Sequence, residues 1–244
     1  MITSDNGYCE RFLQHLGAEE IVSFDVSAWE NADELHDFNL PIPDRWHDSF
    51  TTVIDSGSLE HIFNLPVALR SCMEMVAPGG HFITITPANN TFGHGFYQFG
   101  PELFFRACSE SNGFRVEEMI AFETDQINWY EVLDPAVHGR AFTFHNDRPM
   151  YLFVMAQKTK DSPLFANSLQ QSIYADWVWK SGSVARTPPP LFTATKGRVP
   201  ERLKVPLRVL RSRLRSNLGR SRFSEQYFRR LQNPAGRSAH EDDR

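Results

Sequence analysis

Two segments of this sequence combine side chains that can transfer protons and bind a ligand. The first, DSGSLEH, contains Glu60 and His61; the second, PANNTFGHGFYQF, contains Tyr97 and places His94 between two glycines. Histidine has an ordinary pKa close to neutrality, and the glycines let its loop approach another group closely. His94 is therefore the first candidate for a general base, and Tyr97, Glu60 and His61 are further catalytic candidates.

The same two segments also allow structural roles for these residues. His94 and Asn90 can satisfy backbone groups of their own loop, while Glu60 and His61 can be cap and surface residues of the following helix. The second segment is rich in hydrogen-bonding side chains, and its candidates for substrate binding are Asn89, Asn90 and Gln98. The residue types alone leave both interpretations open.

A predicted strand, helix and strand position both segments. The β-branched run 51–54 ends at turn residues, and the apolar residues of 66–76 cover one helix face until Pro78, Gly79 and Gly80 end the run. The apolar run 82–85 predicts the second strand. A connection of this length is a right-handed crossover between parallel strands, and ligands bind at the carboxyl ends of such strands. Both candidate segments lie at those ends.

The remaining chain predicts further elements in the order helix, strand, strand before this unit, and helix, strand, strand after it. Asp25 ends a predicted strand, where a carboxylate can accept hydrogen bonds from a ribose diol or act as a turn residue. The insertion 125–147 is long enough to form a lid and is rich in aromatic residues. The predicted elements are a helix at 5–16, strands at 21–24 and 34–36, a helix at 101–111, and strands at 114–122 and 150–156.

Charge divides the chain. The whole sequence has a net charge of −5, but residues 1–195 hold 11 Lys and Arg against 25 Asp and Glu, whereas residues 196–230 hold 12 against 2. We expect an α/β domain at 1–160, a linker or docking segment at 161–195 and a basic, partly helical tail at 196–244. Leucines at helical spacing from Leu203 to Leu218 allow the tail to contact an anionic membrane surface weakly or to dock on the acidic domain. Too few aromatics accompany the basic residues to suggest nucleic-acid binding.

The composition also bounds location and metal chemistry. Cys9, Cys72 and Cys108 lack CxxC spacing, so they are expected to be core thiols, and no His or acidic cluster has the spacing of a metal site. The first residues show no signal-peptide pattern, and no apolar run is long enough to span a membrane. We therefore expect a cytoplasmic protein.

The ordered set of motifs resembles the class I S-adenosylmethionine-dependent methyltransferases over roughly the first 157 residues. The resemblance is carried by Asp25 after a strand and by the segments DFNLPIP, FTTVIDSGSLEHI, LRSCMEMVAPGGHFI and TPANN, in this order. It implies a Rossmann-like, doubly wound, mostly parallel sheet. It also implies S-adenosylmethionine as cofactor and methyl transfer to an oxygen or nitrogen atom of a small molecule or glycan.

Residue roles follow from the same resemblance. It implies that Asp25 binds the ribose hydroxyls, that Asp37 with Phe38 lies beside the adenine, and that the segment beginning at Asp55, Ser56 and Gly57 lines the methyl-transfer site. One part of the pattern is missing: a first strand and a GxGxG turn that family members place before the helix at 5–16. Either an upstream segment supplies them or another segment fills the gap. The alternative function is an inactive nucleotide-binding or partner-binding module of the same fold.

Overall fold

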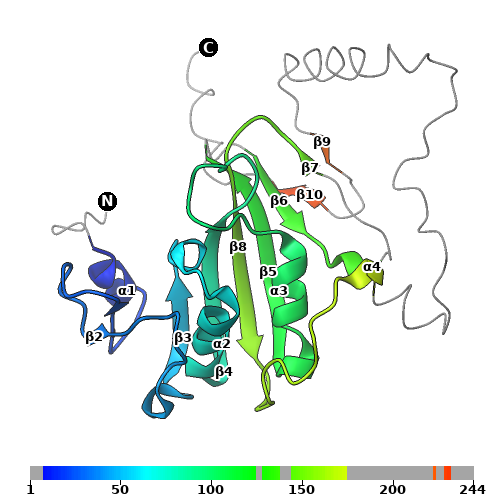
Figure 1. The fold of residues 1–244 in the computed structure, drawn as a ribbon. Coiled ribbons are helices and arrows are strands. Elements are labelled where there is room, and N and C mark those ends of the chain that lie inside the picture. Colours follow the sequence, from blue (N-terminus) through cyan, green and yellow to red (C-terminus); the bar gives the residue numbers. More distant parts are fainter. Residues whose placement is uncertain (1–7, 125–127, 138–143, 175–221, 224–227, 232–244) are drawn as a thin grey trace, which may run out of the picture.

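A six-stranded sheet forms the centre of the computed structural model, which describes residues 8–124, 128–137, 144–174, 222–223 and 228–231 (Figure 1). The strands lie in the order β10-β6-β5-β8-β4-β3. Their bounds are β3 (Phe50–Asp55), β4 (Val76–Pro87), β5 (Phe114–Glu123), β6 (Trp129–Val132), β8 (Met150–Lys158) and β10 (Phe228–Leu231). The strands expected at 51–54, 82–85, 114–122 and 150–156 are thus all present, each somewhat longer than predicted.

The directions of the strands make this a mixed sheet. β3 and β4 pair in parallel, whereas β8 lies antiparallel between β4 and β5. β3, β4 and β5 therefore run the same way, although only the first two of them are neighbours. The short connection from β5 to β6 cannot cross over, so these strands pair as an antiparallel hairpin. The expected α/β fold is confirmed, but the described sheet is mixed and not mostly parallel as predicted, because only β3 and β4 pair in parallel while β8, β6 and β10 all pair antiparallel with their neighbours.

The expected crossover helix is α2 (Leu65–Met75), which connects β3 to β4. It begins with Pro66 in its first turn, where a missing N–H costs nothing, and ends before Pro78. Two short helical turns flank β3 along the chain. η1 (Asp44–Trp46) precedes β3, and η2 (Leu59–His61) lies between β3 and α2. α3 (Pro101–Ala107) follows β4 and leads through η3 (Glu110–Asn112) into β5. The helix expected at 101–111 is thus shorter.

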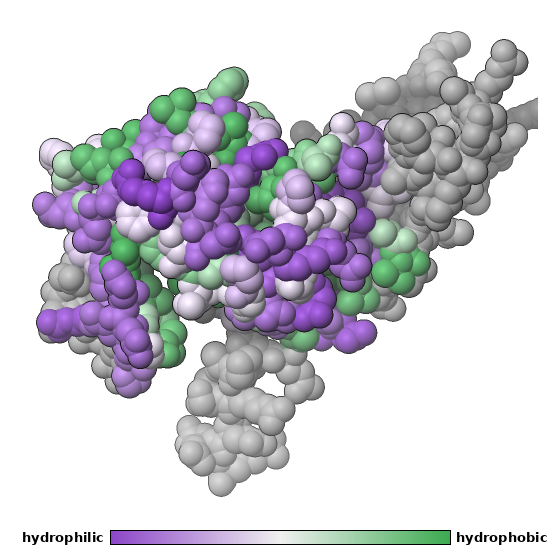
Figure 2. Space-filling model, turned by 90° about the horizontal axis from the view of Figure 1, so that it is seen from below, coloured by the Kyte–Doolittle hydropathy of each residue, from purple (hydrophilic) through white to green (hydrophobic). Residues whose placement is uncertain are grey.

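The edge of the sheet at which β3 begins is mostly hydrophilic, with hydrophobic residues scattered over it; it faces the viewer in Figure 2. A cavity of about 460 Å³ lies here, lined by charged side chains that include Asp48, Lys158 and Asp161. Lys158 is buried and pairs with both of these carboxylates. The cavity therefore contains charges that already have partners, and it lies at the opposite end of β3 from the residues predicted to carry chemistry.

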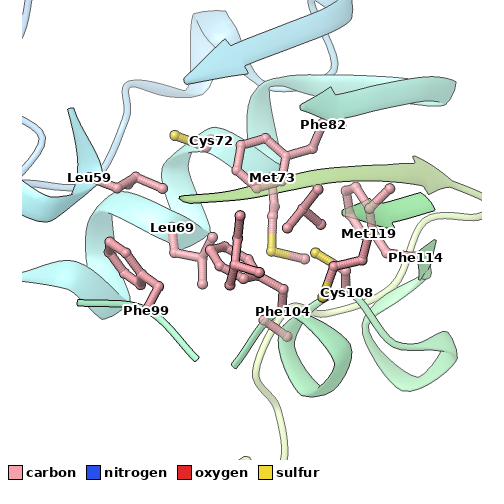
Figure 3. Close-up of a cluster of buried hydrophobic side chains, with 14 of the residues drawn as sticks. Leu59, Leu69, Cys72, Met73, Phe82, Phe99, Phe104, Cys108, Phe114 and Met119 are labelled. Atoms are coloured by element: carbon pink, nitrogen blue, oxygen red, sulfur yellow. The ribbon is translucent and has the colours of Figure 1, made fainter. Parts of the chain in front are cut away.

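One face of the sheet and the helices α2 and α3 share a single hydrophobic core (Figure 3). Leu69 and Met73 of α2 and Phe104 of α3 contact this core, together with Phe82 of β4. The sheet register explains which strand residues reach it, because Phe82 pairs with Ala156 and Thr84 with Val154, and all four are buried. The alternate residues, such as Ile83 paired with Met155, point to the opposite face and are half-buried.

The N-terminal part forms a separate layer beside β3. α1 (Glu10–His15) is followed by β1 (Phe24–Asp25) and β2 (Glu34–Leu35), which pair in parallel as their own small sheet. The ring of Phe24 lies 6.0 Å from that of Phe50 and 5.4 Å from that of Trp46, so aromatic contacts attach this sheet to the start of β3. Within the described residues no strand pairs with the outer edge of β3.

The segments after β8 return to the domain. Residues 162–174 pack along it: Phe165 N donates to Asn112, and Ser172 N of α4 (Ser172–Tyr174) donates to Glu102. Phe228 of β10 is buried beside Phe144. The remaining elements are η4 (Pro135–Val137), β7 (Phe144–His145) and β9 (Arg222–Phe223), the last two paired antiparallel. The leucine-rich stretch 203–218, His138 and Phe142 lie outside the described residues.

Candidate functional site

Glu60 is the centre of the cluster that lies at the carboxyl ends of β3 and β4. It belongs to η2, directly after β3, and its side chain is only 1% exposed. Oε1 faces two histidines, while Oε2 is buried without a hydrogen-bond partner among the described residues. A buried carboxylate that lacks full hydrogen bonding is costly unless a positive charge offsets it. This residue is therefore placed for interaction with a proton donor or a cation.

The loop that follows β4 is held against the main chain of Glu60. The backbone N–H groups of Phe96 and Tyr97 both donate to the carbonyl oxygen of Glu60, at 2.7 and 3.3 Å. Gly95 allows this approach: its φ is +71°, and an added Cβ would lie 2.7 Å from that carbonyl oxygen. His94 is thereby brought over the side chain of the same glutamate, and its Nε2 lies 3.3 Å from Oε1.

His61 completes the cluster from the other side. Its Nε2 lies 3.9 Å from Oε1 of Glu60, and its ring centroid lies 5.0 Å from that of His94. Both histidine side chains are about half exposed, at 52% and 49%, so the cluster is open to solvent on one side and closed by Glu60 on the other. The structure therefore brings together three of the four residues predicted as catalytic candidates.

Tyr97, the fourth candidate, is used differently. Its hydroxyl donates to the carbonyl oxygen of Phe63 at 2.7 Å, and its ring packs beside Phe96 and Phe99. This bond ties the loop after β4 to the start of α2. Tyr97 thus fixes the position of the loop that carries His94, and its hydroxyl proton is donated to the Phe63 carbonyl.

Asp55 organises the turn on which Glu60 stands. Its Oδ1 accepts from the N–H groups of Ser58 and Leu59, and its Oδ2 accepts from the hydroxyl of Thr84 at 2.6 Å. Burial raises the pKa of this carboxyl group above its ordinary value, against the lowering effect of these bonds. Both oxygens are engaged inside the protein. Of its predicted companions, Ser56 is exposed and Gly57 has a φ of +98°, as the turn requires.

Asp25 and Asp37 end β1 and follow β2, as the sequence predicts. Oδ1 of Asp25 accepts from the backbone and hydroxyl of Ser27, and Oδ1 of Asp37 accepts from the backbone and amide of Asn39. The backbone bond from Asn39, followed by its side-chain bond, lowers the pKa of Asp37. In both residues Oδ2 takes no hydrogen bond within the described residues. Each carboxylate therefore keeps one free acceptor.

A pair of asparagines links the region of Asp37 to the helix after the Glu60 turn. Oδ1 of Asn39 accepts from the N–H of Asn64, and the amide of Asn64 donates to the carbonyl oxygen of Asn39, both at 2.9 Å. Phe38 packs edge-on against Phe24 and His36 and is half-buried. No described contact joins Asp25 or Asp37 directly to the Glu60 cluster.

The predicted substrate-binding residues support the loop. Asn89 donates to the carbonyl of Phe144, and the amide of Asn90 donates to the carbonyls of Asn146 and Arg148. Asn90 also adopts a left-handed φ of 60°, which asparagine tolerates well. Oε1 of Gln98 accepts from the backbone and hydroxyl of Thr91. Asn90 thus bonds backbone groups of the segment before β8 and not those of its own loop, and these bonds fix the loop between β4 and α3.

Exposed aromatic rings beside the cluster are a feature that the sequence reading missed. Phe63, Phe92 and Phe96 are 72%, 95% and 66% exposed, and the rings of Phe63 and Phe96 lie 5.8 Å apart. The alternation of aromatic residues in TFGHGFYQF was the available signal. In contrast, Trp129 and Tyr130 of the predicted aromatic lid form β6 on the far side of β5. The exposed rings therefore give the cluster an apolar border, and residues 125–127 and 138–143 of the predicted lid lie outside the described residues.

The two buried cysteines, Cys72 and Cys108, lie in the hydrophobic core. Burial raises the pKa of the Cys72 thiol strongly and that of Cys108 to about 12, so both are neutral thiols in the core, as predicted. Cys9 is exposed, so the prediction of a core thiol is wrong for this residue.

No described helix is long and apolar enough to cross a membrane.

Comparison with known proteins leaves the family open. No family model and no curated protein sequence matches the chain. Solved structures with similar folds include a putative methyltransferase from Bacillus halodurans (12% identity, 62% of this chain and 78% of that chain, TM-score 0.36). They also include an S-adenosylmethionine-dependent methyltransferase from Mesorhizobium loti (16% identity, 62% of this chain and 85% of that chain, TM-score 0.31). A third similar structure is described as "Conversion of a Disulfide Bond into a Thioacetal Group during Echinomycin Biosynthesis" (14% identity, 64% of this chain and 73% of that chain, TM-score 0.38). These scores are too low to assign function, which must be inferred from the chain's own residues.

Proposed function

We propose that this protein is an S-adenosylmethionine-dependent methyltransferase that modifies an oxygen or nitrogen atom of a small molecule or glycan. The observation that carries the proposal is the pairing of Glu60 and His94 at the carboxyl ends of the parallel strands β3 and β4. Ligands of α/β sheets bind at such ends. The proposal rests further on the ordered motifs by which residues 1–157 resemble class I methyltransferases.

The acidic residues of the N-terminal layer fit the nucleoside part of this cofactor. Among the described residues, Asp25 and Asp37 each keep an Oδ2 that takes no hydrogen bond and can accept one from a ligand. Asp25 would bind the ribose hydroxyls, and Asp37 with Phe38 would lie beside the adenine. Asp55 would contribute through the turn it stabilises, together with Ser56 and Gly57, because its own oxygens are already bonded.

The cofactor supplies an electrophilic methyl group on a positively charged sulfur. As the acceptor atom forms its bond to the methyl carbon, the carbon–sulfur bond breaks and the acceptor must lose a proton. With its Nε2–H donated to the Glu60 carboxylate 3.3 Å away, His94 would take that proton on Nδ1, and the carboxylate would stabilise the resulting imidazolium. The exposed rings of Phe63 and Phe96 would hold an apolar part of the acceptor.

A methyl-transfer assay tests this proposal. The full chain is incubated with S-adenosylmethionine carrying a radiolabelled methyl group and with a panel of hydroxyl and amine compounds, including aromatic and sugar acceptors. We expect label in at least one acceptor, and a loss of about 100-fold or more in turnover for His94→Ala. His81→Ala, at the distant Glu117 pair, serves as the control. Binding of the cofactor without transfer to any acceptor would favour a nucleotide-binding module instead.

A further inference from the structure

Glu60, His61 and His94 present three potential metal ligands to one point. One oxygen of Glu60 and one ring nitrogen of each histidine all lie within 4.8 Å of one another. Oε1 lies 3.3 Å from Nε2 of His94 and 3.9 Å from Nε2 of His61. In a tetrahedral Zn²⁺ site, with bonds of about 2.0–2.2 Å, neighbouring ligand atoms lie about 3.3 Å apart. Small side-chain rotations therefore suffice to bring the three atoms around one ion.

We propose that this cluster binds a divalent first-row transition-metal ion, with Zn²⁺ as the best fit. Two imidazoles and one carboxylate form a donor set that suits Zn²⁺, and three protein ligands leave a fourth position open. The open position faces solvent, because both histidine side chains are about half exposed. Such a site can bind a water molecule or a hydroxyl group of a ligand.

The buried state of Glu60 supplies independent support. Its side chain is 1% exposed, and Oε2 has no hydrogen-bond partner within the part of the chain that the structure describes. A cation bound between Oε1 and the two imidazoles would offset the charge of this buried carboxylate.

The surrounding backbone holds the three ligands in place before any ion arrives. The carbonyl of Glu60 accepts the N–H groups of Phe96 and Tyr97, so the loop of His94 is fixed on the same residue that supplies the carboxylate. A Cβ on Gly57 would lie 3.4 Å from Oε1, in ordinary contact with the carboxylate. Asp55 in turn fixes the N–H groups of Ser58 and Leu59 just before Glu60. The cluster is therefore a constrained arrangement of three ligands.

The site was not visible in the sequence, which predicted no metal site. Glu60 and His61 are adjacent, and His94 is 34 residues away from Glu60, so the pattern has no fixed ligand spacing. The fold brings these ligands together at the ends of two parallel strands. An ion here would also change the role of His94, because an imidazole that binds a metal through Nε2 already carries a proton on Nδ1 and cannot act as a base. The ion would then supply Lewis-acid activation of an acceptor hydroxyl, whose proton would pass to solvent.

Metal titration of the full chain tests the site without cofactor or acceptor. The protein is stripped with a chelator, dialysed, and titrated with ZnCl₂ by calorimetry at pH 7. A parallel titration with Co²⁺ follows the visible absorption that reports tetrahedral nitrogen and oxygen ligation. We expect one equivalent of ion bound through this cluster. The affinity should fall as the pH is lowered, because protons compete for the imidazoles.

Three variants and one control locate the binding. His61→Ala and His94→Ala remove half-exposed side chains and should fold, and each should weaken Zn²⁺ binding by roughly 100-fold or more, since loss of a second-shell partner alone costs 10- to 100-fold. Glu60→Gln should do the same and is interpreted only if its circular dichroism is unchanged. His81→Ala, which removes a histidine that pairs with Glu117 3.1 Å away, should bind as the parent does. Equal affinity in all four proteins, or no binding at one equivalent, would overturn the proposal. Neither result depends on methyl transfer.

Discussion

His94 Nε2 lies 3.3 Å from Oε1 of Glu60, although 34 residues separate them, and the carbonyl of the same glutamate anchors the loop that carries the histidine. One residue thus supplies both a backbone support and a side-chain partner. This arrangement makes the position of His94 depend on close packing between two loops. Substitutions that separate the loops should affect the site before they affect the core.

Gly95→Ala should disrupt this packing. The residue has a φ of +71°, and its new Cβ would meet the Glu60 carbonyl oxygen at 2.7 Å, so the loop must shift. We expect a loss of about 1 to 3 kcal/mol in the free energy of unfolding, measured in urea. Gly93→Ala is the matched control, because no atom lies within 4 Å of its Cβ position. Equal stability of both variants would show that the loop is not held against Glu60.

Asp55 should make the free energy of unfolding depend on pH. Burial raises the pKa of its carboxyl group above the unfolded value of about 3.9, so the folded state binds more protons in the interval between the two values. Stability should therefore fall as the pH rises through that interval. Asp55→Asn keeps most of the hydrogen bonds and removes this titration. In urea unfolding from pH 3 to 8, the free energy of unfolding of the variant should rise relative to that of the parent as the pH rises. A constant difference between the two proteins would contradict the raised pKa.

Cysteine reactivity should separate the three thiols. Cys9 is exposed, whereas burial raises the pKa of both Cys72 and Cys108 and removes them from solvent. Brief treatment of the native protein with iodoacetamide at pH 8 should add one label, at Cys9. After denaturation all three should react. Rapid native labelling of Cys72, detected by peptide mass spectrometry, would show that the core between α2 and the sheet opens easily.

The tail should contribute to stability through β10. Phe228 is 3% exposed and its ring lies 4.9 Å from that of Phe144, while the strand covers the edge of β6. Phe228→Ala should lower the free energy of unfolding by about 3 kcal/mol. Arg229→Ala, which removes an exposed side chain on the opposite face of the same strand and its surface ion pair with Glu131, should change it by less than about 1 kcal/mol. If both variants were as stable as the parent, β10 would not be a structural part of the sheet.

Much of the central unit could be predicted because its signals are local. The β-branched run before Asp55, the single apolar face of α2 and the turn residues after it indicated β3, α2 and β4, and the candidate residues were predicted to lie at one sheet edge. Proximity of Glu60, His61 and His94 follows from that parallel pairing. The convergence of their ligand atoms does not, because it depends on the conformations of the two loops.

Features that arise from long-range pairing were less predictable. The antiparallel position of β8 between β4 and β5 is decided by side chains far apart in sequence, and the local pattern shows only an apolar strand. Similarly, β10 pairs with β6 across 98 residues between Arg229 and Glu131. The hydrogen bonds that tie Asn90 to residues 146 and 148 also depend on a distant segment. Polar side chains that look available in a sequence are thus used to hold loops.

Cofactor binding is the most direct test of the proposed function. The full chain is titrated with S-adenosylhomocysteine by calorimetry, beside Asp25→Ala and a control, Asp44→Ala, which removes an exposed carboxylate in η1. We predict saturable binding by the parent and the control. Asp25→Ala should bind more weakly by about 1 to 3 kcal/mol, because the ribose hydroxyls lose their acceptor. Absence of any binding heat at millimolar ligand would contradict the assignment of this chain as a methyltransferase.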